Sequence, residues 1–344
     1  MPAAVQPPLA AAGARVIPSP APVRLTLLSR SISVPSTARL VAAARARGHS
    51  VRVLDPVQVE MHLDGSRGHL LYRRRRLALP DVVLPRIAQS ITSYGLAVVN
   101  QYGMLGVPVM NTAAAIAQAR NKMRCLQLLS AHGISVPATV MARSAGDLKA
   151  MVRLVGGVPV LVKLLGGGDE RGVMVCETLN SLEAALEAIL GLGHNLLIQE
   201  YVRKAGRDVR VLVVGGTPLA AVRRRPRMNR LAHTLNRGAR FERIPLTDAQ
   251  RQVATEAARL IGLEVAAVDM LDVRGLPKVF EVHSSPGLAE MEKAVGEDLA
   301  TPVIVRAEQL AQERPPALDP SPLPAMSRRA HPAPKALKRA RASC

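Results

Sequence analysis

Aromatic residues are scarce in this 344-residue sequence, which has no tryptophan, four tyrosines and two phenylalanines. Its cores must therefore be built from aliphatic side chains and methionine. The scarcity also argues against binding of single-stranded nucleic acid by base stacking, which needs aromatic platforms. No apolar run reaches the roughly 18 residues that a membrane-spanning helix requires. We therefore expect a soluble protein with no membrane partner.

Cysteine is rare too, and Cys125, Cys176 and Cys344 have neither the spacing of a zinc site nor that of a disulfide framework. This pattern fits a reducing compartment and predicts a cytoplasmic protein. Acidic residues are outnumbered, since 26 of them face 46 lysines and arginines and leave a net charge of +20. Such a charge attracts polyanions, whether nucleic acid, acidic peptide or nucleotide, without choosing among them. Composition leaves the oligomeric state open.

The composition separates two tails from a folded middle. Residues 1–22 are rich in alanine and proline and carry almost no charge, whereas residues 313–344 are rich in proline and basic residues. Both tails are predicted to be disordered, because they contain too few apolar residues in patterns that could form a core. The basic tail could contact RNA non-specifically through its phosphates.

The first folded part, residues 23–119, is predicted to be a small α/β domain. A strand at 23–28, a helix that Ser36 caps and that ends near Gly48, and a strand at 51–55 follow one another. Strand, helix and strand at this spacing indicate a parallel βαβ unit.

A hairpin with a strongly basic segment is predicted next, at residues 59–79. It contains four adjacent arginines, Arg73, Arg74, Arg75 and Arg76. Such a run fits either a solvated edge that blocks strand pairing, which is the commoner case, or a binding site. The sequence does not decide between them.

Further along the chain, strong helix signals alternate with strands. Helices are predicted from residue 92 and at 121–131, 247–262 and 298–312, and strands at 81–84, 195–202 and 208–214. Thr247 and Gln250 form a capping box at the start of the third of these helices, because each can bond the backbone N–H of the other.

A buried lysine and a Gly-rich segment lie in the middle of the chain. Lys163 sits among apolar residues in a strand predicted at 159–165, so its ammonium group needs an anionic partner. Residues 166–172 are Gly-rich, and backbone N–H groups of such a loop can approach phosphate closely. A plain hairpin turn is the alternative. No Gly-Lys-Ser/Thr follows, so the segment is not a Walker loop.

Two acidic residues interrupt apolar runs within residues 265–287. Asp269 and Glu281 are each flanked by apolar residues, and a turn at Arg274 and Gly275 joins the two runs into a predicted hairpin. A buried carboxylate must be paired, hydrogen-bonded or metal-bound. Two of them on neighbouring strands form an oxygen cage for Mg²⁺ or Mn²⁺, usually completed by substrate phosphates. Two edge carboxylates facing water are the alternative.

Taken together, these features resemble the ATP-grasp superfamily and, within it, the RimK-type α-L-glutamate ligases that modify ribosomal proteins. The resemblance spans residues 25–312 and includes runs outside the candidate site, at 83–87, 122–129 and 285–288. It implies a fold of class α/β plus α+β. The implied division is an N-terminal parallel-sheet α/β domain at 23–119 and an ATP-grasp domain at 120–312, with a lid-like subdomain at 120–195 and a metal-bearing subdomain at 196–312.

The resemblance also implies which residues hold ATP. Lys122 and Lys163 would hold its α- and β-phosphates, and Asp208 would lie beside the nucleoside. Arg210 would lie near the reacting phosphate as a catalytic residue. A hinge beside the adenine would be formed, largely through backbone groups, by Gln199, Glu200, Tyr201 and Val202.

The implied metal ligands are Asp269, Glu281 and His283, which would bind Mg²⁺ or Mn²⁺, with two ions expected. The implied reaction transfers the γ-phosphoryl group of ATP to a carboxylate, and an amine then attacks the acyl phosphate. In this family the acceptor is the acidic C-terminus of a ribosomal protein and the amine is that of glutamate. A strongly basic protein is compatible with such an acidic peptide.

Three departures from the family pattern bear on activity. His283 stands where the family has asparagine, and imidazole nitrogen favours Mn²⁺ over Mg²⁺. Residues 167–172 bring two carboxylates into the phosphate loop, and Ala232-His233-Thr234 replaces an Arg-Ser-Asn segment. The changes leave two interpretations open: an active ligase, or a catalytically weakened relative that binds nucleotide or a polyanionic partner without ligation.

Overall fold

The computed structural model describes residues 21–65, 67–142, 147–164, 173–191, 195–202, 208–225, 240–273 and 275–313. The Gly-rich loop, the Ala232-His233-Thr234 segment and nearly all of both predicted tails lie outside the described residues. Mixed parallel and antiparallel sheets with helices confirm the predicted α/β plus α+β class. Among the described residues, no helix combines the length and apolar character that crossing a membrane requires.

The N-terminal part contains the predicted parallel βαβ unit. Strands β1 (Arg24–Leu28), β2 (Ser50–Leu54) and β6 (Val82–Pro85) form a parallel sheet in the order β2-β1-β6, and α1 (Pro35–Ala46) connects β1 to β2. The prediction that Ser36 caps this helix is wrong. Pro35 begins the helix, as proline often does, and the Oγ of Ser36 instead accepts the backbone N–H of Leu288 at 2.9 Å.

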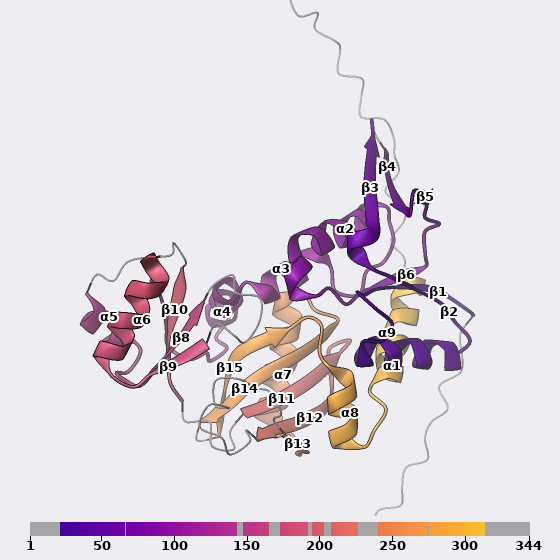
Figure 1. The fold of residues 1–344 in the computed structure, drawn as a ribbon. Helices are drawn as coiled ribbons and strands as arrows, with labels where there is room; N and C mark the ends of the chain where they lie inside the picture. The colour runs from indigo at the N-terminus through magenta and orange to yellow at the C-terminus, as the bar shows by residue number, and fades with distance from the viewer. Residues whose placement is uncertain are drawn as a thin grey trace, which may run out of the picture.

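A separate antiparallel sheet projects from this part (Figure 1). It consists of β3 (Val59–Asp64), β4 (Arg67–Tyr72) and β5 (Arg75–Arg76), so the predicted hairpin is confirmed and extended by a third short strand. Arg73 and Arg74 form the second turn with positive φ angles of 51° and 63°. All four arginines are exposed, as the interpretation of a solvated edge expects.

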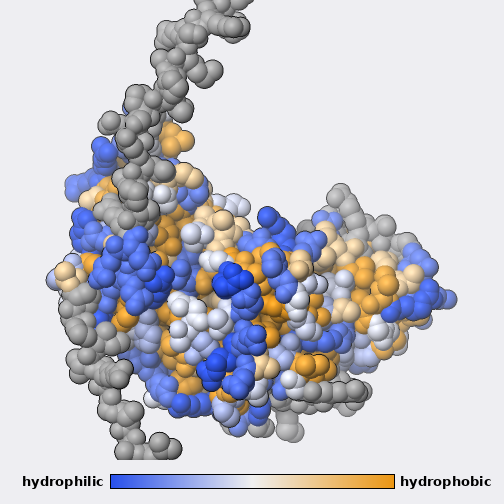
Figure 2. Space-filling view, turned by 180° about the vertical axis from the view of Figure 1, so that it is seen from behind, coloured by the Kyte–Doolittle hydropathy of each residue, from blue (hydrophilic) through white to orange (hydrophobic). Residues whose placement is uncertain are grey.

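A small lobe, which we define as β7 to β10 with α5 and α6, extends to one side of the molecule (Figures 1 and 2). Its antiparallel sheet has the order β7-β10-β8-β9, made of β7 (Thr139–Ala142), β10 (Leu196–Glu200), β8 (Val160–Leu164) and β9 (Val173–Cys176). The helices α5 (Leu148–Leu154) and α6 (Leu179–Gly191) pack on one face of this sheet through aliphatic residues such as Leu182 and Leu186.

The large sheet is antiparallel throughout, in the order β13-β12-β11-β14-β15. Its strands are β13 (Arg240–Arg243), β12 (Thr217–Arg225), β11 (Asp208–Val214), β14 (Val265–Val273) and β15 (Leu276–His283). The predicted hairpin with Asp269 and Glu281 is therefore confirmed as β14 and β15.

Helices cover both faces of the large sheet. One face packs against α3 (Ala113–Arg120), α4 (Lys122–Ala131) and α7 (Asp248–Ile261). The other packs against α8 (Leu288–Val295), α9 (Ala300–Gln312) and α1.

The predicted capping box of Thr247 and Gln250 begins α7. The helices α3 and α8 were not predicted, whereas α2 (Thr92–Met104) begins where the sequence predicted it. Two short 3₁₀ helices, η1 (Pro56–Gln58) and η2 (Gln89–Ile91), complete the fold.

Candidate active site

The candidate site lies on one face of the large sheet, where three adjacent strands present polar side chains in a row. Arg210 on β11 lies directly opposite Asp269 on β14, which lies opposite Glu281 on β15. Because side chains alternate along a strand, these residues share the face on which Leu212 and Val265 pack against α8 and α9. We call Arg210, Asp269 and Glu281 the polar row, and they continue this face beyond its apolar end.

Asp269 is fully buried and is neutralised by two arginines. Its Oδ1 and Oδ2 accept hydrogen bonds from Nε and Nη2 of Arg210, both at 2.7 Å, and Oδ2 also accepts one from Nη2 of Arg224 at 3.0 Å. Burial acts to raise the pKa of Asp269, but the positive charges around it hold this pKa well below its ordinary value. The alternative of two carboxylates facing water is therefore wrong for Asp269.

Glu281 lies at the open side of the row, with its side chain 25% exposed. Its Oε1 accepts a hydrogen bond from Nζ of Lys122 at 2.6 Å, and its Oε2 is 3.9 Å from Nε2 of His283. Burial acts to raise the pKa of Glu281, but His283 and Lys122 outweigh it and lower this pKa to about 2. Glu281 is thus an ionised carboxylate held beside a lysine.

Three predicted metal ligands come together at this point. Asp269, Glu281 and His283 offer ligand atoms that all lie within 4.8 Å of one another. Ligands at about 2.0–2.6 Å from a common divalent ion can have this separation. Two carboxylate oxygens and an imidazole nitrogen form a mixed donor set, which transition metals accept more readily than Mg²⁺ does. The residues therefore fit a divalent cation, which would share the oxygens of Asp269 with Arg210.

A β-bulge helps to join the small lobe to this site. The pairing of β14 with β15 shifts after Asp269, which inserts Phe280 as an extra residue on β15. Bulges re-aim side chains near functional sites. The Nζ of Lys163, on β8, lies 5.6 Å from the centroid of the Phe280 ring, a distance typical of a cation–π contact. Lys163 is buried, and its charge contributes to the low pKa of Glu281.

Two of the predicted hinge residues make side-chain hydrogen bonds, one within the small lobe and one to the large sheet. Nε2 of Gln199, which is buried on β10, donates to Oγ1 of Thr139 at 2.8 Å. Both carboxylate oxygens of Glu200 accept hydrogen bonds from Nζ of Lys278, at 3.1 and 2.8 Å. Lys278 belongs to β15, so this pair connects the small lobe to the large sheet. Lys278 could not be singled out from the sequence, because nothing in its local pattern indicates a distant acid.

The other two predicted hinge residues follow β10 directly. Val202 is buried in a small apolar cluster with Leu271 and Phe280, while Tyr201 is half-buried. Val202 therefore packs against β14 and β15, two of the strands that carry the polar row.

Arg224 is the main site residue that the sequence analysis did not single out. Its guanidinium lies between two acids, with Nη2 3.2 Å from Oδ1 of Asp208 and 3.0 Å from Oδ2 of Asp269. Asp208 is buried and faces this arginine. Strand alternation was the available signal, because positions 222 and 224 share one face of β12 and Val222 is apolar. Three arginines further along the chain, Arg227, Arg230 and Arg237, lie outside the described residues.

Comparison with known protein families gives a match over most of the chain. Residues 23–116 match the RimK PreATP-grasp domain, and residues 119–306 match the RimK-like ATP-grasp domain. The chain belongs to the RimK-like ATP-grasp family. The predicted family and the predicted enzyme class, an ATP-dependent ligase, are thereby confirmed.

Curated relatives agree along nearly their whole length. A probable alpha-L-glutamate ligase of Aeromonas salmonicida (strain A449) is 41% identical over 293 residues, which cover 85% of this chain and 98% of the relative. A probable alpha-L-glutamate ligase of Vibrio cholerae serotype O1 (strain ATCC 39541 / Classical Ogawa 395 / O395) is 39% identical over 293 residues, covering 85% and 97%.

Solved structures confirm the ATP-grasp fold. The ATP-grasp ligase PsnB complexed with minimal precursor has a TM-score of 0.67 at 21% identity, covering 84% of this chain and 99% of PsnB. A D-alanine–D-alanine ligase from Bacillus anthracis complexed with ATP has a TM-score of 0.64 at 17% identity, covering 85% and 98%. PsnB has also been solved with Mg and ADP. The family uses ATP and Mg²⁺.

Proposed function

We propose that this RimK-family protein is a ligase that adds glutamate to the acidic C-terminus of a peptide or protein, such as a ribosomal protein, through an acyl-phosphate intermediate. The polar row carries the proposal, because Glu281, directly opposite Asp269, lies beside Lys122 and feels the charge of Lys163, two lysines from other elements. Curated relatives named probable alpha-L-glutamate ligases support the choice of glutamate.

The nucleotide would be held between the small lobe and the large sheet. Lys122 and Lys163 would contact the α- and β-phosphates, and the hinge of Gln199, Glu200, Tyr201 and Val202 would contact the adenine through its backbone. Asp208 would lie beside the nucleoside as a carboxylate that is paired with Arg224. The proposal includes an N-terminal domain at residues 23–119 and an ATP-grasp domain at 120–312, whose lid-like and metal-bearing subdomains meet between residues 195 and 196.

A divalent cation at Asp269, Glu281 and His283 would neutralise phosphate oxygens during transfer. The His283 nitrogen makes Mn²⁺ a better occupant than Mg²⁺, and a second ion would bind on the phosphate side. Arg210 contacts Asp269 and lies 3.1 Å from His283, so it would position these ligands as well as stabilise developing negative charge.

The proposed reaction has two steps. An oxygen of the acceptor carboxylate attacks the γ-phosphorus of ATP, the bond to the β-phosphate oxygen breaks, and ADP leaves. The amine nitrogen of glutamate then attacks the acyl carbon, the carbon–oxygen bond to phosphate breaks, and the amine loses a proton. The chain's residues form no covalent bond in this scheme, so positioning and charge neutralisation dominate catalysis.

A phosphate-release assay tests the proposal. Purified protein that is given ATP, Mg²⁺ or Mn²⁺, glutamate and peptides with acidic C-termini should release phosphate. The peptides should gain the mass of a glutamate residue, which mass spectrometry detects. Glu281→Gln should lower turnover by about 100-fold or more, because the loss of a ligand exceeds the 10- to 100-fold effects of removing its supporting contacts. Failure of every acceptor with either metal would overturn the ligase proposal.

A weakened relative that binds nucleotide or a polyanionic partner without ligation is the second candidate. One observation favours it: Arg210 engages both oxygens of Asp269, which a metal ion must share. Calorimetry that detects ATP binding, together with no phosphate release under any of the conditions above, would favour this second function.

A further inference from the structure

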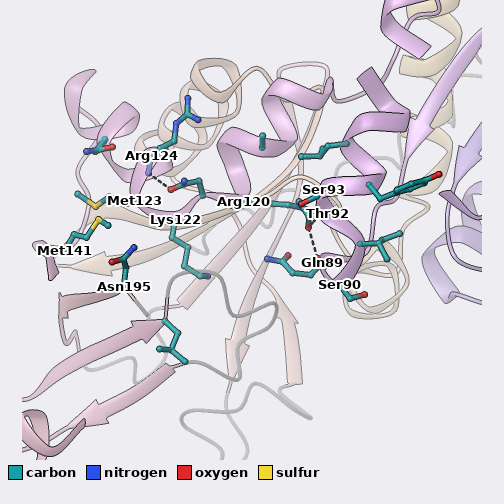
Figure 3. A pocket seen from close by; sticks show the side chains of 17 residues that line it. Gln89, Ser90, Thr92, Ser93, Arg120, Lys122, Met123, Arg124, Met141 and Asn195 are labelled. Carbon is teal, nitrogen blue, oxygen red and sulfur yellow. Dashed lines mark hydrogen bonds between the residues drawn. The ribbon is translucent and has the colours of Figure 1, made fainter. Parts of the chain in front are cut away.

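A cleft of about 950 Å³ lies beside the polar row, between the N-terminal part of the chain and the small lobe (Figure 3). Its walls come from η2 and the start of α2, from the end of α3 and the start of α4, and from the small lobe. We propose that this cleft binds an acidic peptide, with Arg120 and Arg124 holding its carboxylates and with Lys122, which contacts Glu281, as the link to the polar row. The inference rests on the proposed function and places the acceptor of that reaction.

The charge of the cleft supports an acidic occupant. The charged residues among its described lining are Arg120, Lys122 and Arg124, with no aspartate or glutamate. Charges of one sign in a concave site focus the electrostatic potential and raise the local concentration of oppositely charged ligands. A segment of consecutive glutamates would therefore meet only attractive charges along this described lining.

Arg120 is the most constrained of these cations. Its Nη1 donates to Oγ1 of Thr92 at 2.5 Å and to the backbone oxygen of Ala88 at 3.4 Å, and its Nη2 donates to the backbone oxygen of Ile87. These described partners are all neutral, and burial lowers the pKa of Arg120. A partly buried guanidinium held only by neutral oxygens is stabilised when a carboxylate approaches it.

The remaining lining suits a peptide in an extended conformation. Hydroxyl and amide groups that can bond a peptide backbone come from Gln89, Ser90, Ser93, Asn121, Gln127 and Asn195. Met123 and Met141 add flexible apolar surface, which adapts to the aliphatic stems of glutamate side chains. The volume lies near the upper end of the roughly 300–1,000 Å³ of ligand pockets, which leaves room for several residues.

Lys122 connects the cleft to the polar row. This residue lines the cleft, and its Nζ is 2.6 Å from Oε1 of Glu281. A peptide whose last residue reached Lys122 would thus present its terminal carboxylate at the proposed metal site. RNA is a poorer occupant, because Tyr94 is the single aromatic residue in the described lining and base stacking would be weak.

Fluorescence anisotropy without ATP tests this assignment. The probe is a labelled ten-residue peptide that ends in four glutamates, and its comparison is the same peptide ending in four glutamines. Wild type should bind the glutamate peptide about tenfold more tightly or better, since each charge-assisted contact contributes on the order of 1.4 kcal/mol, a factor of ten. Equal binding of both peptides would overturn the inference.

Two cleft variants and one matched control sharpen the test. Arg124 and Ser90 are exposed, so Arg124→Gln and Ser90→Glu should each weaken binding of the glutamate peptide by about tenfold without unfolding the protein. Arg153→Gln makes the same charge change as Arg124→Gln at an exposed position of α5 outside the cleft, and it should bind as wild type does. A short uridine RNA is then tested as a competitor of the glutamate peptide. If the RNA displaces the peptide from wild type but not from Arg124→Gln, the cleft is a nucleic-acid site and the proposal is overturned.

The outcomes separate this inference from the proposed function. If both cleft variants bind the peptide and ligate it as wild type does, the cleft assignment is wrong and the ligase proposal stands. If the protein releases no phosphate with any acceptor but binds the glutamate peptide through Arg124, the ligase proposal fails and the cleft remains an acidic-peptide site.

Discussion

At the scale of single residues, the acids of the site are matched by cations before any ligand arrives. Asp269 contacts Arg210 and Arg224, and Glu281 contacts Lys122. A divalent cation alone would therefore add positive charge to a neutralised site, which is unfavourable in a partly buried setting. A metal ion that arrives with the phosphates of a nucleotide brings its own compensation.

Metal and nucleotide should consequently bind in a coupled way. We expect Mn²⁺ alone to bind weakly and to bind at least about tenfold more tightly in the presence of a non-hydrolysable ATP analogue, because coupling free energies of 1–3 kcal/mol are typical. Calorimetric titration of Mn²⁺ with and without the analogue measures the difference. Equal affinities would show that the acids do not serve the nucleotide.

His283 should set the metal preference. The His283→Asn variant replaces the imidazole nitrogen with an amide oxygen, which is the harder ligand that Mg²⁺ prefers. We expect its phosphate release with Mg²⁺ to rise relative to that with Mn²⁺, by about tenfold in the ratio. The ratio of the two rates in wild type and variant is the measurement, and an unchanged ratio would remove His283 from the ligand set.

At the scale of elements, Ser36 connects the first helix to a helix that lies about 250 residues further along the chain. Its Oγ accepts the N–H of Leu288, which begins α8, and both residues are buried. Helix starts leave N–H groups without intrahelical partners, and a buried one needs a partner from elsewhere. Ser36 provides that partner, which explains why it lies inside α1 and does not cap it.

Ser36→Ala should therefore destabilise the protein by about 1–2 kcal/mol, the penalty for a buried donor that loses its hydrogen bond. Urea unfolding followed by circular dichroism measures the change. Ser33→Ala is the matched control, since Ser33 is exposed and bonds only the nearby Ser31 within the described residues. Similar losses for both variants would contradict the proposed role of the Ser36 contact.

At the scale of the whole molecule, the last helix ties the C-terminal end of the fold to the first domain. Glu308 on α9 accepts hydrogen bonds from Arg47 at 2.5 and 2.9 Å, and one of its oxygens is 2.5 Å from Nε2 of His49. Both Glu308 and His49 are buried. The two ends of the fold thus share a buried polar network, in which every charge has a described partner.

This network should make stability depend on pH. Burial acts to raise the pKa of Glu308, but the hydrogen bonds from Arg47 and His49 lower it below the ordinary value of 4.5. A carboxylate with a lowered pKa in the folded state contributes stability above its unfolded pKa and loses it as the pH falls through the folded pKa. The contribution of Glu308 should therefore be full at pH 7 and should decrease below about pH 4.5.

Glu308→Gln should lower the free energy of unfolding by about 3–5 kcal/mol at pH 7, as expected when one partner of a buried ion pair is removed. The difference from wild type should shrink as the pH is lowered from 5 to 3. Urea unfolding of both proteins across this range tests the prediction. A difference that stays constant with pH would mean that the charge of Glu308 does not stabilise the fold.

Much of the architecture could be predicted from local patterns. The parallel βαβ unit, the capping box of α7 and the hairpin of β14 and β15 all follow from signals in contiguous stretches of sequence, and each is confirmed. The helices α3 and α8 escaped prediction because they are short, and their stability comes from packing on the large sheet.

The sequence by itself determined the residue types of the site: acids inside apolar strands, a lysine among valines and leucines, and a basic surface. It could do so because a buried charge in an apolar run needs a partner wherever that partner lies. Only the tertiary structure decided which residues are the partners of these charged groups. Sheet register paired Asp269 with Arg210, the approach of α4 paired Lys122 with Glu281, and strand alternation brought Arg224 to Asp208. Such pairings depend on contacts between distant segments, which no local pattern encodes.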